Sequence, residues 1–270
     1  MKKIVYGICL LALFVTACEE KEIVIPELSS GARRVLVEEI TGVNCSNCPD
    51  GARELAALQK QIGADKLILV AIHSGGDLSK PVPQSTMDLQ TTEGYALVDY
   101  IGQLSGIPSA AISRRYFPDE GSEFAVGAWS ARITNEFKRD YNLDLFVANT
   151  YDPITRKLDI KVNMAPDSTL LGEHRLTVVI TEDSIVNAQN DNSVIILNYV
   201  HRHAFRDIVT AINGDLVAEP LTAGALISKT YSLTLPAAWD DKHCTVVAYL
   251  HHGGTPDKII LQAAEDHVVE

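Results

Sequence analysis

The residues most able to do chemistry are two cysteines three positions apart, Cys45 and Cys48, in the segment Asn-Cys-Ser-Asn-Cys-Pro. Two sulfurs at this spacing can work as a redox-active dithiol, supply half of a zinc site, or form a disulfide that only staples the chain. Zinc is disfavoured because it needs four ligands and the pair supplies two, while His73 fits better as the last residue of a strand. We therefore expect no metal ion here.

Patterns around the pair predict the elements that position it. The β-branched run Arg34–Gly42 predicts a strand. Apolar residues at helical spacing predict a helix over Pro49–Ile62, which Gly63 ends. The continuous apolar run Lys66–His73 is typical of a buried parallel strand. The sequence thus predicts a strand–helix–strand unit with both cysteines at the N-terminal end of its helix.

That placement assigns a role to each sulfur. A cysteine at a helix N-terminus lies near unsatisfied N–H groups and the positive end of the helix dipole, which favour the thiolate. A second sulfur three residues on can reach the first and resolve a mixed disulfide. We expect Cys45 to be the exposed nucleophile and Cys48, in the first helical turn, to be the resolving cysteine.

Further elements follow along the chain to about residue 140. Gly75–Gln90, with two glycines and two prolines, predicts an inserted loop. Thr92–Leu104 and Phe124–Asp140 have the apolar spacing of helices. Between them, the turn Gly106-Ile107-Pro108 leads into a short apolar strand.

The cysteine pair after the first strand, with an Ile107–Pro108 turn before a later strand, resembles the thioredoxin fold over residues 33–140. The resemblance implies that Pro108 is cis and packs against the disulfide, and that Ile107 offers backbone groups to a substrate chain. It also implies that Glu39, six residues before Cys45, is a buried acid that assists proton transfer. The family's tryptophan before the motif and proline within it are absent here. Redox activity and a structural disulfide in a thioredoxin-shaped scaffold both stay open.

The periodicity changes after Asp140. Short alternating or apolar runs, separated by turn signals such as Asn213-Gly214, follow one another without helical stretches. The runs are Leu143–Asn149, Leu158–Met164, Leu176–Thr181, Thr230–Leu235 and Thr245–Leu250. They predict an antiparallel, immunoglobulin-like β-sandwich over residues 141–270. The expected fold class is therefore α/β plus all-β, in two domains that behave as separate folding units.

Other reactive side chains of this second half are interpreted as structural. His201 and His203 are expected to be half-exposed histidines on one face of a strand, because no carboxylate stands at a metal-binding spacing from them. Cys244 opens an apolar strand, which favours an inert core thiol. The sequence has no Ser-His-Asp signature, phosphate loop or glycosidase motif, and no cofactor is expected.

The N-terminus predicts an exported, lipid-anchored protein. Two lysines, a short apolar run and Val-Thr-Ala-Cys18 resemble the signal of a bacterial lipoprotein, with residues 1–17 removed and Cys18 acylated. The apolar run is too short to span a bilayer. Residues 18–32 are expected to be a tether. Together with Thr-Gly-x-x-Cys-x-x-Cys-Pro, this signal resembles the outer membrane protein 28-related lipoproteins.

Charge and compartment limit the partners. The net charge is −12 and becomes more negative once the two lysines of the signal are removed, which argues against binding nucleic acid or anionic lipid. No Asp follows Cys18, so the usual inner-membrane retention signal is missing and the outer membrane is expected. The acidic run Glu19–Glu22 fits a surface-export tag and a solvated linker equally well, so the membrane face stays open. Expected partners are the membrane, through Cys18, and thiols or disulfides of envelope proteins.

The lipid anchor gives the first testable prediction. The mature protein should begin at an acylated Cys18, and Cys18→Ser should release it from membranes, because the acyl chains are its only expected attachment. Fractionation of cells, with the processed form identified by mass spectrometry, measures this. An unchanged membrane fraction, once an uncleaved precursor is ruled out, contradicts the lipoprotein interpretation.

Overall fold

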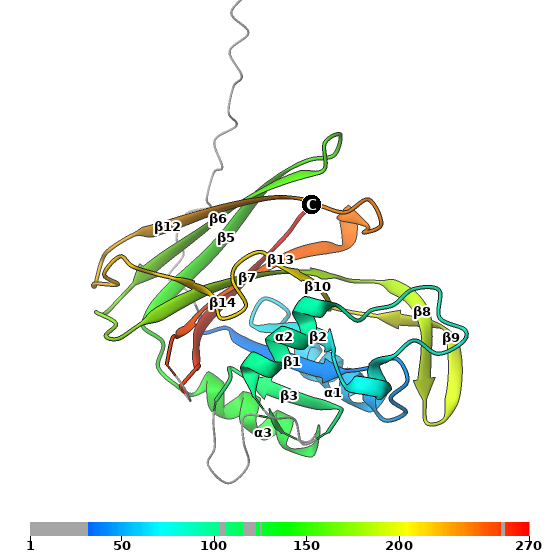
Figure 1. Cartoon of the computed structure of the whole chain (residues 1–270). Helices are drawn as coiled ribbons and strands as arrows, with labels where there is room; N and C mark the ends of the chain where they lie inside the picture. Colours follow the sequence, from blue (N-terminus) through cyan, green and yellow to red (C-terminus); the bar gives the residue numbers. More distant parts are fainter. Residues whose placement is uncertain (1–31, 103–105, 116–122, 125, 255–256, 270) are drawn as a thin grey trace, which may run out of the picture.

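A computed structural model describes residues 32–102, 106–115, 123–124, 126–254 and 257–269 (Figure 1). The expected signal peptide, Cys18 and the tether up to residue 31 lie outside these ranges. The described chain is mixed α/β and mainly sheet, as the sequence predicts at that level.

The first half contains a four-strand arrangement with helices on both faces. Its elements are β1 (Val35–Thr41), α1 (Cys48–Ile62), β2 (Leu67–His73), the 3-10 turn η1 (Gly76–Ser79), α2 (Thr92–Ile101), β3 (Ser109–Ile112), β4 (Glu123–Phe124) and α3 (Val126–Phe137). Strand order is β2-β1-β3-β4, with β2 parallel to β1 and with β3 and β4 each antiparallel to its neighbour. The predicted strand–helix–strand unit and the loop after it are confirmed.

The two faces of this sheet have separate cores. Successive side chains of a strand point to opposite faces, so Val35 and Val37 pack with α1 and α3, where Leu55 and Trp129 are buried. Leu36 and the other side chains of alternate positions pack with α2 on the opposite face. The same alternation sends the neighbouring acids of β1, Glu38 and Glu39, to opposite faces.

The second half is built almost entirely of antiparallel strands. These are β5 (Leu143–Asp152), β6 (Lys157–Pro166), β7 (His174–Glu182), β8 (Ile185–Asp191), β9 (Val194–His201), β10 (Ala204–Ile208), β11 (Asp215–Leu216), β12 (Ile227–Thr234), β13 (Cys244–His252) and β14 (Ile260–His267), with the 3-10 turn η2 (Asp241–His243) before β13. The sheet β12-β6-β5 packs on β14-β13-β7 through one apolar core. Four of the five predicted runs lie wholly within these strands, and the fifth, Thr230–Leu235, extends one residue beyond β12.

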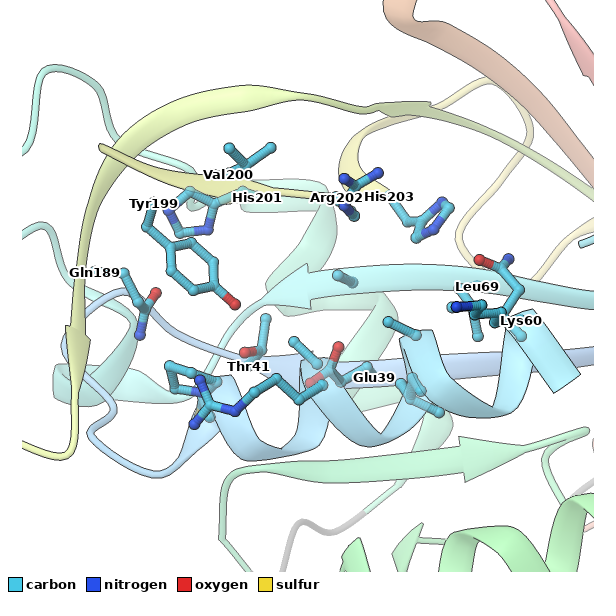
Figure 2. Close-up of a pocket in the computed structure, with 18 of the residues that line it drawn as sticks. Glu39, Thr41, Lys60, Leu69, Gln189, Tyr199, Val200, His201, Arg202 and His203 are labelled. Carbon is cyan, nitrogen blue, oxygen red and sulfur yellow. The ribbon is translucent and has the colours of Figure 1, made fainter. Parts of the chain in front are cut away.

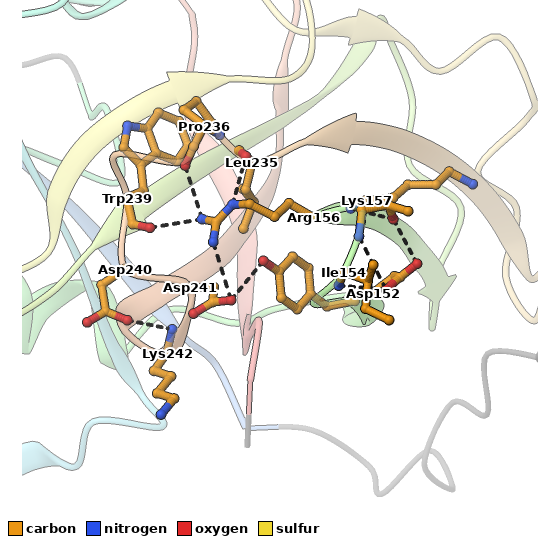
Figure 3. A network of polar contacts seen from close by, with 12 residues as sticks. Asp152, Ile154, Arg156, Lys157, Leu235, Pro236, Trp239, Asp240, Asp241 and Lys242 are labelled. Atoms are coloured by element: carbon orange, nitrogen blue, oxygen red, sulfur yellow. Dashed lines mark hydrogen bonds and ion pairs between the residues drawn. The ribbon is translucent and has the colours of Figure 1, made fainter.

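Arg156 closes one end of the two packed sheets (Figure 3). It lies in the β5–β6 turn, and its guanidinium donates to the carbonyls of Leu235, Pro236 and Trp239 at 2.8–3.1 Å. Asp241 lies 3.5 Å from the same guanidinium and accepts a 2.8 Å hydrogen bond from the hydroxyl of Tyr151. One side chain thus bonds the β5–β6 turn to the β12–β13 connection, which runs from one sheet to the other.

The two halves share one sheet. Its path runs β14-β13-β7-β10-β2-β1-β3-β4, and β10 meets β2 in parallel where Ala204 lies opposite Ala71. The core on the α2 face includes Leu36 and Ile72 from the first half and Phe205 and Val247 from the second. Besides the core that each half has of its own, one core is therefore common to both halves, and the boundary near residue 141 stays a prediction.

A buried ion pair lies at this junction. Arg114 bonds both carboxylate oxygens of Glu38, at 2.7 and 2.5 Å, and all these side chains are almost completely inaccessible. The hydroxyl of Tyr249, from β13, accepts from Arg114 at 2.7 Å and donates to Glu38 at 3.1 Å. A tyrosine of the second half is therefore hydrogen-bonded to both members of an ion pair in the first half.

This network generates a stability prediction. Arg114→Met should lower the free energy of unfolding by about 3–5 kcal/mol, because it leaves the Glu38 carboxylate buried without its partner. Tyr249→Phe should cost only about 1–2 kcal/mol, because it removes hydrogen bonds but keeps the ion pair. Urea unfolding followed by tryptophan fluorescence measures both.

The same experiment tests whether the halves unfold together. The protein has two tryptophans, Trp129 in α3 and Trp239 before β13. Trp129→Phe and Trp239→Phe backgrounds leave one reporter each. Because the core is shared, Tyr249→Phe should shift the midpoint equally at both reporters. A shift seen by only one tryptophan contradicts a common unfolding unit.

Candidate functional site

Cys45 and Cys48 are joined as a disulfide at the start of α1, with their Cα atoms 5.4 Å apart. Helix α1 begins at Cys48, and Pro49 occupies its first turn, where an N–H is dispensable. The remaining cysteine of the described chain, Cys244, is a buried free thiol, and burial raises its pKa to about 12. The interpretation of Cys244 as a core thiol is confirmed.

The Ile107–Pro108 turn lies beside the disulfide. The Ile107–Pro108 peptide bond is cis, and the Ile107 carbonyl oxygen lies 3.8 Å from the Cys45 sulfur. The first turn of α1 packs closely on this turn at Gly51. A Cβ there would lie 2.8 Å from the Trp129 ring and 3.2 Å from the Pro108 ring. A larger residue at position 51 would therefore push α1 away from the proline.

Glu39 lies beneath the same turn of α1. It retains 5% of its accessible surface, and its Oε1 atom would be 3.0 Å from a Cβ at position 51. This oxygen has no hydrogen-bond partner in the described part of the chain. Burial raises the pKa of Glu39 to about 8, so the carboxyl is largely protonated at neutral pH. A protonated acid behind Cys48 can hold and return a proton.

The expectation that Cys45 is the exposed sulfur is wrong for this structure. Cys45 and Cys48 are each 2% exposed. The cover comes from two segments that the local pattern around the motif does not reveal. One is the turn η1, where the Leu78 carbonyl accepts from Asn44 N–H at 2.9 Å. The other is the β8–β9 hairpin of the second half.

The hairpin is bonded to the loop that carries Cys45. Backbone N–H groups of Asn190 and Asn192 donate to carbonyls of the loop, at Val43 and Ser46, at 2.9 and 2.8 Å. The buried side-chain amide of Gln189 donates to the carbonyls of Gly42 and Cys45 at 3.1 and 3.2 Å. Residues 189–192 are therefore hydrogen-bonded to the segment 42–46, which we call the motif loop.

An ion pair fastens the end of the hairpin to the helix. The guanidinium of Arg53, on α1, lies 2.8 Å from the carboxylate of Asp191 and 2.5 Å from that of Asp50. The hydrogen bonds to both carboxylates raise the pKa of Arg53, and they hold the pKa of Asp191 below its usual value. Because the Arg53 side chain is half exposed, this contact adds little stability and mainly orients the hairpin.

A pocket of about 620 Å³ lies between α1, the edge of β2 and strand β9 (Figure 2). Its lining includes Glu39, Cys48 and His73, and Tyr199 and His201 reach into it from β9. The rings of His73 and His201 are 5.5 Å apart, and those of Tyr199 and His201 are 4.8 Å apart. The hairpin thus encloses a space behind the disulfide as well as covering its loop.

The histidines differ from the sequence interpretation. His201 is the last residue of β9 and is buried, because it points into the pocket and not to solvent. His203 lies in the β9–β10 turn with a φ of 51°, so the two do not share a strand face. Burial lowers the pKa of His201 to about 4 and that of His73 to about 3, and both are neutral at physiological pH. No group of three metal-ligating side chains gathers anywhere in the described ranges.

The structure brings together Cys45, Cys48, Glu39, Ile107 and Pro108, while Cys18 lies outside the described residues. Gln189 and Tyr199, from the second half, also belong to the site, and no motif in the sequence points to either residue. A hairpin signal does exist: Asn192 and Ser193 both have positive φ in the β8–β9 turn, a conformation that Asn favours. Nothing in that local signal predicts that the hairpin lies over the motif.

Comparison with known proteins places the chain in a family. A model of the outer membrane protein Omp28 family matches residues 95–265, more than half of the chain. The chain belongs to the Omp28 family. Membership makes it an outer membrane lipoprotein of the cell envelope. The match begins after Cys45, Cys48 and Glu39, so it carries no information on their chemistry.

Solved structures add a fold comparison. HBP35 of Porphyromonas gingivalis is similar with a TM-score of 0.72 and 17% identity, over 88% of this chain and 76% of that one. At that identity the likeness shows the fold alone. A domain of the outer membrane lipoprotein Omp28 from Porphyromonas gingivalis matches with a TM-score of 0.34 and 14% identity. The match covers 48% of the present chain and 91% of that domain, and it is too weak for a structural conclusion. No curated protein matches. In the described residues no helix is long and apolar enough to cross a membrane.

The raised pKa of Glu39 predicts a pH dependence of stability. Between its ordinary pKa of 4.5 and its folded pKa of about 8, the folded protein keeps a proton that the unfolded chain releases. The contribution of Glu39 to the free energy of unfolding is therefore fully present at low pH and is lost as the pH rises toward 8. Glu39→Gln should remove this loss, by up to about 1.4 kcal/mol per pH unit.

Urea unfolding at a series of pH values from 6.5 to 8, with the disulfide kept closed, measures the slope. In this window His73 and His201 are largely neutral in the folded state. Glu54→Gln, on α1, is the matched control and should leave the slope unchanged. Equal slopes for the wild type and Glu39→Gln show that Glu39 is ionised in the folded protein.

Proposed function

We propose that this outer membrane lipoprotein is a lipid-anchored thiol–disulfide oxidoreductase that uses the Cys45–Cys48 pair. The observation that carries the proposal is the grouping of the disulfide, the cis Ile107–Pro108 turn and the buried acid Glu39 around the first turn of α1. The anchor in this proposal is the acylated Cys18.

A thioredoxin-like first domain is part of the proposal. It is supported by the strand order β2-β1-β3-β4 and by α1 and α3 on one face with α2 on the other. The second half, with β12-β6-β5 packed on β14-β13-β7, is proposed to be the immunoglobulin-like sandwich. In this view the first domain supplies the chemistry and the second covers and orients it.

The exchange runs in two balanced steps. The Cys45 thiolate attacks a disulfide of an envelope protein, so a bond forms between Cys45 and one client sulfur while the other client sulfur leaves as a thiolate. Cys48 then loses its proton and attacks Cys45, which closes the internal disulfide and expels the second client thiolate. In this proposal Glu39 accepts the proton from Cys48 once it has itself been deprotonated. The reverse sequence oxidises a client dithiol.

The backbone of Ile107 has a positioning role in this scheme. Its carbonyl lies 3.8 Å from the Cys45 sulfur, so a client chain bonded to Ile107 would bring its own sulfur to Cys45. Because Cys45 is covered, the client must first displace η1 or the β8–β9 hairpin.

A second candidate function is a non-enzymatic surface or binding lipoprotein with a structural disulfide. It is favoured by one observation: both sulfurs are 2% exposed and their loop is bonded to the hairpin. In that case the disulfide fixes the short loop between strand and helix, and the thioredoxin-shaped half is a scaffold.

Trapping of mixed disulfides separates the two functions. In the oxidoreductase, Cys48→Ala should accumulate covalent partners on the cell envelope, because Cys45 can attack but nothing resolves the product. Cys45→Ala should trap few. The measurement is mass spectrometry of partners released by reductant from each affinity-purified variant.

Gln189→Ala, added to Cys48→Ala, tests whether the hairpin limits access to Cys45. Loss of its bonds to the motif loop should increase the trapped amount, because the loop opens more readily. Asn187→Ala is the control, since this buried amide of the same strand bonds residues 86 and 87 and not the motif loop. Equal, negligible trapping by Cys45→Ala and Cys48→Ala, with and without Gln189→Ala, supports the structural disulfide.

A further inference from the structure

The pocket behind α1 has the size of a small-molecule site. Its volume of about 620 Å³ is within the range of about 300–1,000 Å³ that is usual for ligand pockets. Its walls are largely apolar, with Ala52, Ala56 and Leu69 among the lining residues. It lies on the side of Cys48, whereas the Ile107 backbone lies against Cys45. The two sides of the disulfide therefore present different surfaces.

The charge around this pocket is opposite to that of the whole protein. The chain has 35 acidic and 23 basic residues, yet the lining contains three basic side chains, from Arg53, Lys60 and Arg202, and one acid, Glu39. Arg53 is neutralised by its two carboxylate partners. Lys60 has no hydrogen-bond or ion-pair partner among the described residues, and Arg202 has only Asp183, at 3.7 Å. Figure 2 shows Lys60 and His203 at the end of the pocket opposite Gln189.

Three residues of the pocket lining have a buried polar atom without a hydrogen bond. Among the described residues these atoms are Glu39 Oε1, His73 Nδ1 and His201 Nε2, each with almost no accessible surface. All three residues line the pocket and are at least 95% buried. A buried polar atom left unpaired costs about 1–3 kcal/mol, so a rotation of these side chains toward a polar group bound in the pocket would relieve that cost.

We propose that this pocket binds a small organic anion with an apolar body. Its anionic group lies at the Lys60 and Arg202 end, its apolar body lies along the alanines of α1 and Leu69, and a polar group faces His73, His201 and Glu39. This binding is separate from thiol–disulfide exchange, because it needs no reaction of the Cys45–Cys48 bond.

The probe is anilinonaphthalene sulfonate, a fluorescent anion with an aromatic body. It is titrated into residues 18–270 carrying Cys18→Ser, so that neither an acyl chain nor detergent competes for the dye. The wild-type pocket should bind one dye per chain, and octanoate should displace it while octylamine does not. Lack of saturable binding, or equal displacement by octylamine, overturns the proposal.

Two pocket variants and two controls locate the dye. Lys60→Glu should weaken binding about tenfold, because it reverses the unpaired charge at the pocket end. Ala52→Phe should abolish binding by filling the space. Lys138→Glu, at the end of α3, is the matched charge control and should leave the affinity unchanged. Ile196→Ser, on the outward face of β9, should also have no effect, since that apolar side chain is outside the pocket.

The outcome does not depend on Ala52→Phe folding correctly, because Lys60 is exposed and its replacement leaves the helix packing intact. Thermal unfolding checks each variant. Unchanged affinity in Lys60→Glu, or loss of binding in Ile196→Ser alone, shows that the dye binds the outer surface and overturns the proposal. Either result leaves the mixed-disulfide experiment unaffected, so the two hypotheses fail separately.

Discussion

The pairing of β2 with β10 is the constraint on which the rest of the structure depends. It is short: the N–H of Ala71 donates to the carbonyl of His203 at 2.8 Å, and Ala204 lies opposite Ala71. This contact places the end of β9 at the open edge of β2. Because β8 and β9 form one hairpin directly before β10, the hairpin lies beside α1 (Figure 1), and its Gln189 bonds the carbonyls of Gly42 and Cys45. The cover on the disulfide and the pocket behind it both result from where this one edge is joined.

Strand alternation gives two adjacent acids of β1 different surroundings. Glu38 and Glu39 are both buried, but they point to opposite faces of β1. Glu38 meets Arg114 and Tyr249, so its charge is compensated and it joins the two halves. Glu39 meets α1 without a cation, so burial dominates and raises its pKa to about 8. Two glutamates thus differ by their surroundings: Glu38 is paired with an arginine, and Glu39 is a buried acid with a raised pKa.

The sequence predicts what depends on local pattern and misses what depends on packing between the halves. β1, α1 and β2 follow from apolar periodicity and a glycine stop, and the cis state of Pro108 follows from the resemblance to thioredoxins. The burial of Cys45 and His201 could not be predicted in this way. Both depend on a hairpin more than 140 residues from the motif, and no periodicity encodes which surface it covers. The shared core was missed for the same reason, since alternating strands look alike whether a sheet ends or continues.

The cover over the motif separates the rate of disulfide exchange from its equilibrium. Each hydrogen bond between residues 189–192 and the motif loop contributes about 0.5–1.5 kcal/mol, so opening costs a few kcal/mol and reduces the reactive fraction accordingly. Opening does not change the free-energy difference between the closed protein with and without its disulfide, which sets the redox potential. A covered redox-active disulfide is therefore reduced slowly by a small reductant but reaches an ordinary equilibrium, whereas a structural disulfide resists reduction at equilibrium as well. A dithiothreitol titration followed to its end point, and not an initial rate, distinguishes an oxidoreductase from a scaffold when both sulfurs are buried.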